Sequence, residues 1–226
     1  MAERDGVSDH SGDRDARRRE WFRYYSEKRV QHQWFQVHLL KGLAVETVLE
    51  IGPGLGFVSA LLDNAGFRVT TLDVLPRQYA HPRINHIRAD IRDTPAERLT
   101  GFDALICCET LEHLHWPDVD DVLRKFRTAA PRYLIISVPY VGLQLDWRLY
   151  VNPHRLRHAF SFKKFNSFRR FRFDEAADPW GHKWEAGYRG HGLTALEEKL
   201  SQAGWRVLRR DFTSPTRSVF YLAEPL

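Results

Sequence analysis

The stretch VLEIGPGLG, residues 48–56, sets the fold that we expect for this chain. An apolar run ends there in a glycine turn, and FVSALLDNAG follows with the pattern of a helix that ends at a glycine. Because Gly52, Gly54 and Gly56 lack a Cβ atom, the backbone can turn tightly and approach a ligand closely. The free N–H groups at the helix start face the same turn. The stretch therefore predicts a strand, a turn and a helix around a binding edge.

The alternation of strands and helices begins at residue 46 and continues along the chain after this stretch. Apolar runs typical of strands lie at residues 46–51, 68–73, 85–90, 102–108, 132–139, 205–210 and 217–224. Helical patterns separate most of them, which predicts an α/β fold with a largely parallel sheet and helices on both faces. Only a turn around Ser214 and Pro215 separates the last two strands, so a terminal hairpin should make the sheet mixed.

Length and composition fit one folded domain. The chain has 226 residues, and 43% of them are hydrophobic. Residues 1–14 are polar and charged and are expected to form a disordered tail, while residues 15–226 are expected to form the single domain. Within it, residues 15–42 have the content of an N-terminal helical segment. Residues 141–193 show no strong periodicity and are interpreted as an insertion or lid.

Composition also limits the compartment and the partners. No run of about 18 apolar residues occurs, so we expect no membrane partner. The N-terminus lacks the apolar core of a signal peptide, which favours a soluble cytoplasmic protein. Cys107 and Cys108 are adjacent within an apolar run and are predicted to be buried free thiols. The net charge of +5 leaves anionic partners open, and no pattern predicts an oligomeric state.

Acidic residues follow the first three strands at the expected binding edge. Glu50 precedes the glycine turn, Asp73 ends the second strand about 20 residues further on, and Asp90 ends the third. A carboxylate at the position of Asp73 can accept hydrogen bonds from ribose hydroxyls. The glycine spacing is G-x-G-x-G and not the dinucleotide pattern G-x-G-x-x-G. These acids therefore favour a cationic nucleoside over a dinucleotide.

These motifs together resemble those of the class I S-adenosylmethionine-dependent methyltransferases. VLEIGPGLG is similar to the first motif of that family and TLDV to the second, while the segments around Asp90 and CCETLEHL are similar to the third and fourth. The resemblance covers residues 46–140 and the terminal helix and hairpin. It implies a Rossmann-like seven-stranded sheet in the order 3-2-1-4-5-7-6, with strand 7 antiparallel, and S-adenosylmethionine as cofactor.

The resemblance also implies the residues of the cofactor site. It assigns the methionine part to the first strand and turn, the ribose to Asp73, and the adenine to the segments that follow the second and third strands. The implied cofactor-binding residues are Glu50, Gly52, Gly54, Gly56, Asp73, Val74, Leu75, Asp90, Ile91 and Glu109. Glu109, at the end of the fourth strand, would lie near the methionine amino group or the acceptor.

ETLEHLHW, residues 109–116, carries further titratable groups. Glu109, Glu112 and His113 share one face of a helical turn and could ligate a divalent cation. The E-x-x-E-H pattern resembles metal-dependent 2′-O-methyltransferases that act on small RNAs, and His182 in GHKWEAG resembles their further ligand. The implied metal site is Glu109, Glu112, His113 and His182. The pattern also occurs in quinone-type O-methyltransferases. In the alternative that this implies, Glu109 positions the cofactor, and Glu112 and His113 cap the next helix or form hydrogen bonds.

Without a metal, an acceptor hydroxyl still needs a base. His113 and His182 are the candidate catalytic bases, because an imidazole titrates near pH 6.5. Tyr140, which ends the fifth strand in SVPY, is a candidate catalytic residue that could touch the acceptor. Methyl transfer otherwise requires mainly that acceptor and methyl group are aligned.

The insertion is basic and aromatic. From Asp146 to Asp174 no acidic residue intervenes, and Arg and Lys alternate with Phe in FSFKKFNSFRRFRF. Such a segment could bind single-stranded RNA, form a lid over a small acceptor, or dock on the domain with its arginines in water.

We therefore predict an S-adenosylmethionine-dependent methyltransferase that transfers a methyl group to oxygen or nitrogen of a small-molecule acceptor. One alternative is a metal-assisted RNA 2′-O-methyltransferase. The other is a non-catalytic protein that binds adenosylmethionine or RNA.

Overall fold

The computed structural model describes residues 11–76, 81–142, 145–152, 154–162, 171–213 and 217–226. Most of the predicted tail, the turn around Ser214 and Pro215, and the Lys- and Arg-rich residues 163–170 lie outside this part of the chain.

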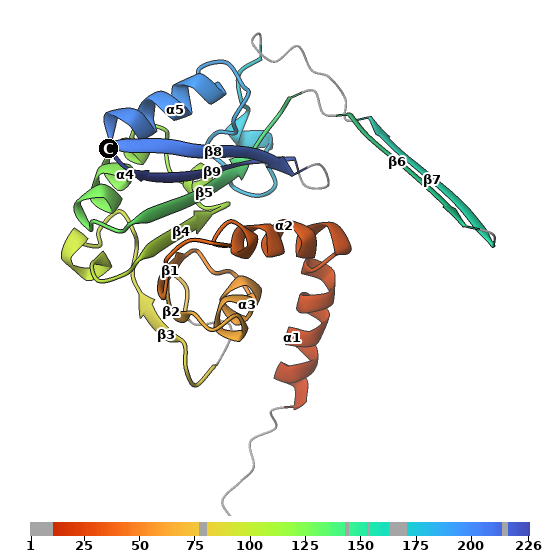
Figure 1. The fold of residues 1–226 in the computed structure, drawn as a ribbon, viewed down its shortest axis with the longest axis horizontal. Coiled ribbons are helices and arrows are strands. Elements are labelled where there is room, and N and C mark those ends of the chain that lie inside the picture. Colours follow the sequence, from red (N-terminus) through yellow and green to blue (C-terminus); the bar gives the residue numbers. More distant parts are fainter. Residues whose placement is uncertain (1–10, 77–80, 143–144, 153, 163–170, 214–216) are drawn as a thin grey trace, which may run out of the picture.

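The centre of the fold is a seven-stranded sheet in the order β3-β2-β1-β4-β5-β9-β8 (Figure 1). Its strands are β1 Thr47–Ile51, β2 Arg68–Asp73, β3 Asn85–Arg88, β4 Ala104–Cys108, β5 Tyr133–Pro139, β8 Trp205–Thr213 and β9 Ser218–Pro225. The neighbouring strands β3, β2, β1, β4 and β5 run parallel to one another. Strand β9 runs antiparallel to both of its neighbours, β5 and β8. The predicted order and the antiparallel strand are confirmed, with two further strands, β6 and β7, falling between β5 and β8 in the sequence.

Helices cover both faces of this sheet, as predicted. Helices α2 Glu27–His38 and α3 Phe57–Asn64 pack on one face, and α4 Asp118–Thr128 and α5 Leu193–Gln202 pack on the other. Because successive side chains of a strand point to opposite faces of the sheet, the buried side chains form two clusters, one on each face. On β4, Leu105 and Cys107 belong to the cluster under α4 and α5, while Ile106 and Cys108 belong to the other. Both cysteines are buried free thiols, as expected.

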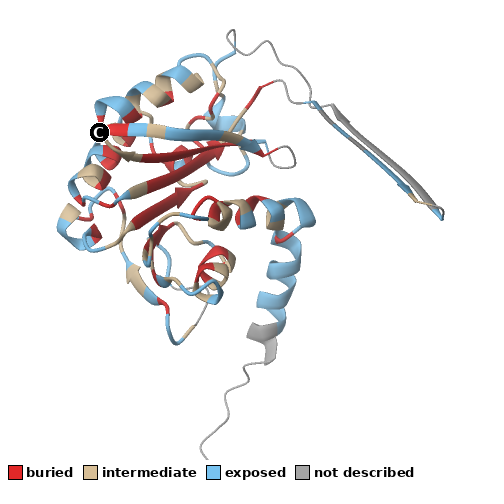
Figure 2. Cartoon of the chain, viewed as in Figure 1, coloured by how far each residue is buried: buried red, intermediate tan, exposed pale blue. Residues whose placement is uncertain are grey.

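The N-terminal segment forms two helices, of which the first is largely exposed (Figure 2). Helix α1, Ser11–Tyr24, begins inside residues 1–14, so the prediction of a tail up to residue 14 is wrong for its last four positions. The reason is that the Arg, Glu and Ala residues that follow are good helix formers, which lets the helix extend beyond the aromatic positions. Ser26 caps α2, since its hydroxyl accepts a hydrogen bond of 3.3 Å from Arg29 N.

The insertion divides into a hairpin and a return segment. Strands β6 Leu145–Asn152 and β7 Arg155–Phe162 form a separate antiparallel sheet that projects away from the main one (Figure 1). After the short helix η4, Glu175–Ala177, the chain re-enters the core at Trp184, whose indole N–H donates to Leu114 O at 3.2 Å. None of the helices in the described ranges combines the length and apolar character that crossing a bilayer requires.

Asp103 joins the beginnings of two central strands. Its Oδ2 accepts hydrogen bonds from Glu46 N at 2.9 Å, Thr47 N at 3.0 Å and Thr47 Oγ1 at 2.9 Å. The two backbone N–H groups are the main reason that the pKa of the Asp103 carboxyl falls from 3.8 to about 2. The ionised carboxylate thus fixes the start of β1 against the segment that leads into β4.

We predict that Asp103→Ala lowers the free energy of unfolding at neutral pH by about 1–3 kcal/mol. A depressed pKa means that the carboxylate stabilises the fold above its unfolded pKa of about 4 and loses this effect as the pH falls towards about 2. Urea unfolding over this pH range should therefore show the difference from wild type shrinking towards acid pH. The exposed Asp93→Ala serves as control, and a difference independent of pH would contradict the assignment.

Candidate active site

A cavity of about 510 Å³ opens at the carboxyl ends of the central strands, beside α2. It lies where the order of strands reverses between β1 and β4, which is the usual ligand position in such sheets. Most of the residues that line it come from the glycine turn, α2, the segment after β4 and the return segment of the insertion. They include Glu50, Gly52, Gly54, His32, Gln33, Gln36, Glu109, Glu112, His113 and His182.

The glycine turn has the backbone that its sequence predicts. Gly52, Gly54 and Gly56 have φ values of 72°, 53° and 80°, a left-handed region that favours glycine. At Gly52 a Cβ atom would collide with the side chain of Thr110. The Thr110 hydroxyl donates to Cys108 O at 3.0 Å and lies 3.3 Å from Ile51 O, so it connects the ends of β4 and β1.

Glu50 is a buried carboxyl group at the cavity wall. It accepts a short hydrogen bond from the Ser59 hydroxyl of α3. Burial raises the pKa of Glu50 to about 7, and the negative charge of Asp73 adds to the effect. A positively charged ligand group at this wall would favour the ionised carboxylate.

The residues expected to hold a nucleoside lie along the same edge. Asp73 ends β2, and its Oδ1 accepts a hydrogen bond from Leu75 N at 2.9 Å. Val74 and Leu75 are exposed, whereas Ile91 is buried in the core. The Asp90 carboxylate is paired with Arg92, with Nη2 to Oδ2 at 2.6 Å. Ala89 N donates to Asp73 O at 2.9 Å, so the ends of β2 and β3 lie side by side, although none of these residues lines the cavity described above.

Glu109 stands at the end of β4 in a strained backbone conformation, with φ of 50°. Its Oε1 accepts a hydrogen bond of 2.8 Å from Ser137 Oγ. His32 Nε2 of α2 lies 3.8 Å from the same oxygen, and burial lowers the pKa of His32. Sequence reasoning missed His32, Gln33 and Gln36. The available signal was polar residues on the apolar side of an amphipathic helix, which are buried in the structure.

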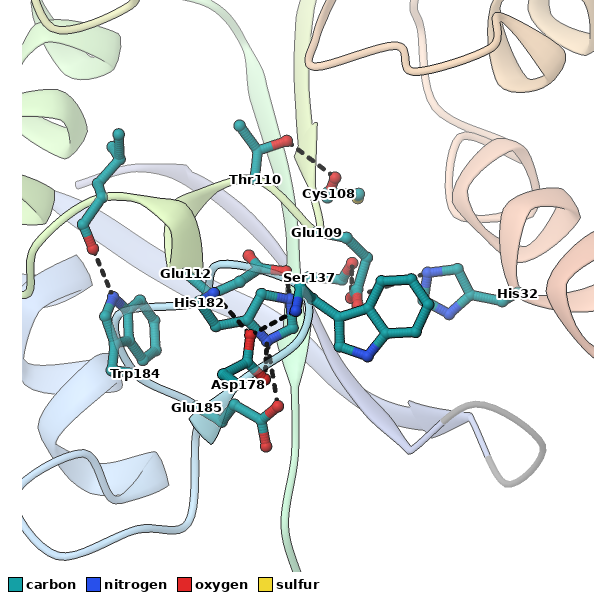
Figure 3. A network of polar contacts seen from close by, with 12 residues as sticks. His32, Cys108, Glu109, Thr110, Glu112, Ser137, Asp178, His182, Trp184 and Glu185 are labelled. Carbon is teal, nitrogen blue, oxygen red and sulfur yellow. Dashed lines mark hydrogen bonds and ion pairs between the residues drawn. The ribbon is translucent and has the colours of Figure 1, made fainter. Parts of the chain in front are cut away.

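His182 lies between two groups of carboxylates (Figure 3). Its Nε2 is 4.0 Å from Glu112 Oε1, and its Nδ1 is 3.1 Å from Glu185 Oε1 and 3.9 Å from Asp178 Oδ1. The rings of His113 and His182 lie 5.0 Å apart at a steep angle. Asp178 and Glu185 were missed from sequence because their contact with His182 depends on the fold of the return segment.

Glu112 is the least ordinary of these groups. The side chain is fully buried, and neither carboxylate oxygen has a hydrogen-bond partner among the residues that the structure describes. Burial holds the pKa of Glu112 well above its usual range, and the charge of Glu109 raises it further. Ligand atoms of Glu112, His113 and His182 lie within 4.8 Å of one another, a spacing that could hold a metal ion. Glu109 is not part of this group.

Tyr140, the third predicted catalytic residue, has different surroundings. The ring of Tyr140 packs on Phe212, with centroids 5.1 Å apart, and Tyr140 does not line the cavity. The structure thus assembles His113 and His182 but leaves Tyr140 outside the cavity wall.

Comparison with known proteins defines the class. Residues 22–209 match the family described as "Methyltransferase domain", so the chain belongs to this family. Its sheet order and motifs are those of the class I S-adenosylmethionine-dependent methyltransferases, which confirms the resemblance seen in the sequence.

Curated relatives include ubiquinone biosynthesis O-methyltransferases. The protein from Methylocella silvestris is 29% identical over 160 residues, which are 57% of this chain and 60% of that protein. The protein from Xanthomonas oryzae is 31% identical over 91 residues, 36% of this chain and 37% of the relative. These matches span less than two thirds of the relatives' own length.

Solved structures share the fold at low identity. The 1,6-didemethyltoxoflavin-N1-methyltransferase of Burkholderia thailandensis, solved with bound 1,6-didemethyltoxoflavin and S-adenosylhomocysteine, has a TM-score of 0.58 and 15% identity. The match covers 99% of this chain and 93% of that one. The N-methyltransferase NodS of Bradyrhizobium japonicum, in complex with S-adenosylhomocysteine, has a TM-score of 0.59 and 15% identity, with 91% of each chain covered.

We predict that Glu50→Gln makes the free energy of unfolding of the ligand-free protein less dependent on pH. The raised pKa of Glu50 means that the contribution of this residue to stability is greatest below its unfolded pKa of about 4.5 and is lost as the pH rises through about 7. Over this window the free energy of unfolding of wild type should fall by about 2–3 kcal/mol relative to Glu50→Gln. Denaturant unfolding at a series of pH values measures it, with the exposed Glu97→Gln as control. Parallel curves for wild type and Glu50→Gln would contradict the assignment.

Proposed function

We propose that this protein binds S-adenosylmethionine and transfers its methyl group to a hydroxyl or amino group of a small molecule. The observation that carries the proposal is a single cavity with two different walls. One wall is the glycine turn with Glu50, and the other is the pair His113 and His182. The first wall suits a cationic cofactor and the second suits an acceptor that must lose a proton.

The residues at the first wall fit the cofactor. Gly52 has no side chain, so a ligand can approach its backbone closely. The buried Glu50 has no cation among its described contacts. When bound, S-adenosylmethionine supplies a methyl group activated by a sulfonium. Glu50, Gly52, Gly54 and Glu109 would hold its methionine part, and the buried amides of Gln33 and Gln36 offer further hydrogen bonds. Asp73 would bind the ribose, and Gly56, Val74, Leu75, Asp90 and Ile91 complete the proposed set.

His182 is the proposed base at the second wall. The carboxylate of Glu185 at 3.1 Å favours a proton on Nδ1, which leaves the Nε2 lone pair free to take a proton. Nε2 faces the interior, where Glu112 and His113 lie. Burial raises the pKa of Glu112 well above its usual range and so favours the neutral form of this carboxyl group. Protonated Glu112 can donate a hydrogen bond to an acceptor oxygen and so help to orient it.

The relatives and the histidine pair both bear on the nature of the acceptor. The ubiquinone biosynthesis O-methyltransferase relatives favour methylation of oxygen, and the histidine pair agrees with this because a hydroxyl must be deprotonated during transfer. The two N-methyltransferases described above share only the fold. We therefore propose a hydroxylated small molecule as the acceptor.

A metal-assisted reaction is the second candidate, and it is favoured by the buried carboxyl group of Glu112, which has no hydrogen-bond partner among the described residues. A buried carboxylate is normally hydrogen-bonded or bound to a cation. Glu112, His113 and His182 offer one carboxylate and two imidazoles within 4.8 Å, a donor set that fits a divalent transition metal. Bound there, the metal would lower the pKa of an acceptor hydroxyl. With RNA as the acceptor, this is the metal-assisted 2′-O-methyltransferase that the sequence left open.

Asp73→Ala should weaken the binding of S-adenosylhomocysteine at least tenfold, because two ribose hydroxyls lose a charged acceptor. Isothermal titration calorimetry measures the dissociation constant, and Asp93→Ala is the matched control on a neighbouring exposed turn. An unchanged affinity in Asp73→Ala would refute the ribose assignment.

His182→Gln should reduce methyl transfer by about 10²–10⁴-fold while S-adenosylhomocysteine binding changes little. Transfer is followed with labelled cofactor and a panel of hydroxylated aromatic acceptors, and the exposed His115→Gln serves as control. If His182 acts as base, wild-type transfer survives a chelator. Transfer that is lost with chelator and restored by a divalent ion indicates the metal instead.

A non-catalytic protein would give a third pattern in the same assay. It would bind S-adenosylhomocysteine and transfer no methyl group to any acceptor of the panel, with or without added metal. That result would overturn the proposed enzyme function but leave the cofactor assignment intact.

A further inference from the structure

The β6–β7 hairpin has an apolar face that the described structure leaves open. Side chains alternate between the two faces of a strand. On β6, one face carries Leu145, Trp147, Leu149 and Val151, each between 58% and 66% exposed. Figure 2 shows β6 as a largely exposed strand outside the main body. Exposed apolar patches of this kind commonly mark a surface that binds a partner.

The register of the hairpin extends this pattern to the second strand. Positions that pair directly across two antiparallel strands belong to the same face. The partners of the apolar β6 positions are Phe162, Phe160, His158 and Leu156. The other face combines the pairs Asp146–Ser161, Arg148–Ala159, Tyr150–Arg157 and Asn152–Arg155. The hairpin is therefore amphipathic, with an apolar face and a polar face that carries arginine positions.

Among the described residues, no other layer of the fold packs against the hairpin. It forms a sheet of its own, and the ribbon in Figure 1 shows it extending away from the seven-stranded sheet. An isolated two-stranded hairpin is marginally stable in water and gains stability when its apolar face is covered. A partner that covers this face would supply the missing layer.

The charge of the segment identifies the partner as anionic. No acidic residue occurs between Asp146 and Asp174. In the same interval, basic residues stand at Arg148, Arg155, Arg157, Lys163, Lys164, Arg169, Arg170 and Arg172. A second copy of the chain would present the same positive charge, so this surface disfavours pairing with itself.

The arrangement of apolar and basic positions favours a lipid surface over RNA. Single-stranded RNA is bound by aromatic rings and cations that share one face. Here Leu145, Leu149 and Val151 are aliphatic and cannot stack with bases, and the arginine positions of β6 and β7 fall on the opposite face. Elements that lie in a bilayer interface have this division, with Trp and Leu towards the acyl chains and arginines on the polar face.

We propose that the β6–β7 hairpin docks on membranes that contain anionic lipid, with its apolar face in the interfacial region. No spanning helix is needed for such peripheral contact, which is why the lack of a long apolar run gave no sign of it. The proposal stands independently of the proposed enzyme function.

Docking would also position the cavity. The hairpin follows β5, whose last residue, Pro139, lines the cavity. The chain that returns from the hairpin supplies Trp180 and His182 to the same wall. The segments on either side of the hairpin in the chain therefore both line the cavity wall that includes His182. A membrane bound to the hairpin would lie on this side of the cavity.

Co-sedimentation of the full chain with vesicles tests the proposal. We expect binding to phosphatidylcholine vesicles that contain phosphatidylglycerol, at least tenfold weaker binding to phosphatidylcholine alone, and weakening by salt. The variant Trp147→Ser with Leu149→Ser should reduce partitioning by at least about tenfold, since two apolar side chains no longer enter the interface. The matched control is Trp34→Ser, an equally large ring that is 52% exposed on α2.

A second variant, Arg155→Glu with Arg157→Glu, tests the charge and should also lose binding to the anionic vesicles. Thermal unfolding checks that each variant keeps the core, which the hairpin does not join. The proposal is overturned if wild type ignores both kinds of vesicle, if Trp34→Ser loses as much binding as the hairpin variants, or if the hairpin variants lose binding only to a single-stranded RNA oligonucleotide.

Discussion

The contact between Gly52 and Thr110 is the constraint on which the site depends. The backbone turns at Gly52 in the left-handed region directly after β1, and Gly52 has no side chain. The side chain of Thr110 occupies the space where a Cβ atom of this residue would be. The Thr110 hydroxyl also reaches the backbone at the ends of β1 and β4. The two strand ends are thereby held side by side, which sets Glu50 and Glu109 around one cavity at the point where the strand order reverses.

The fold keeps costly polar groups at this cavity. Glu50 and Glu112 are buried carboxyl groups whose pKa values are raised by burial, and a well-packed apolar side chain at either position would be less costly. Glu109 adds a strained backbone. Burial and strain of this kind are concentrated at functional sites, because the same groups that destabilise the empty fold can bind charge or move protons. The two walls of the cavity divide these tasks.

The insertion contributes to the molecule in two separate ways. Its return segment is part of the core, where Trp184 is buried and His182 meets Glu112. Its hairpin lies outside the core and presents an amphipathic surface. One loop between β5 and α5 therefore both completes the cavity and carries an external binding face, which is consistent with the way this class of fold varies function through its connections.

The sequence by itself determined most of the strands and helices and the glycine turn, because strand and helix periods and turn residues are local signals. The order of the strands followed from the resemblance of its motifs to a known family. The sequence did not reveal His32, Asp178 or Glu185, and it placed Tyr140 in a role that its packing on Phe212 does not support. Nor did it show the amphipathic hairpin, whose faces follow from the pairing of two strands. These features were decided by tertiary structure alone, because they arise from contacts between segments distant in sequence, and no local pattern records which side chains will meet.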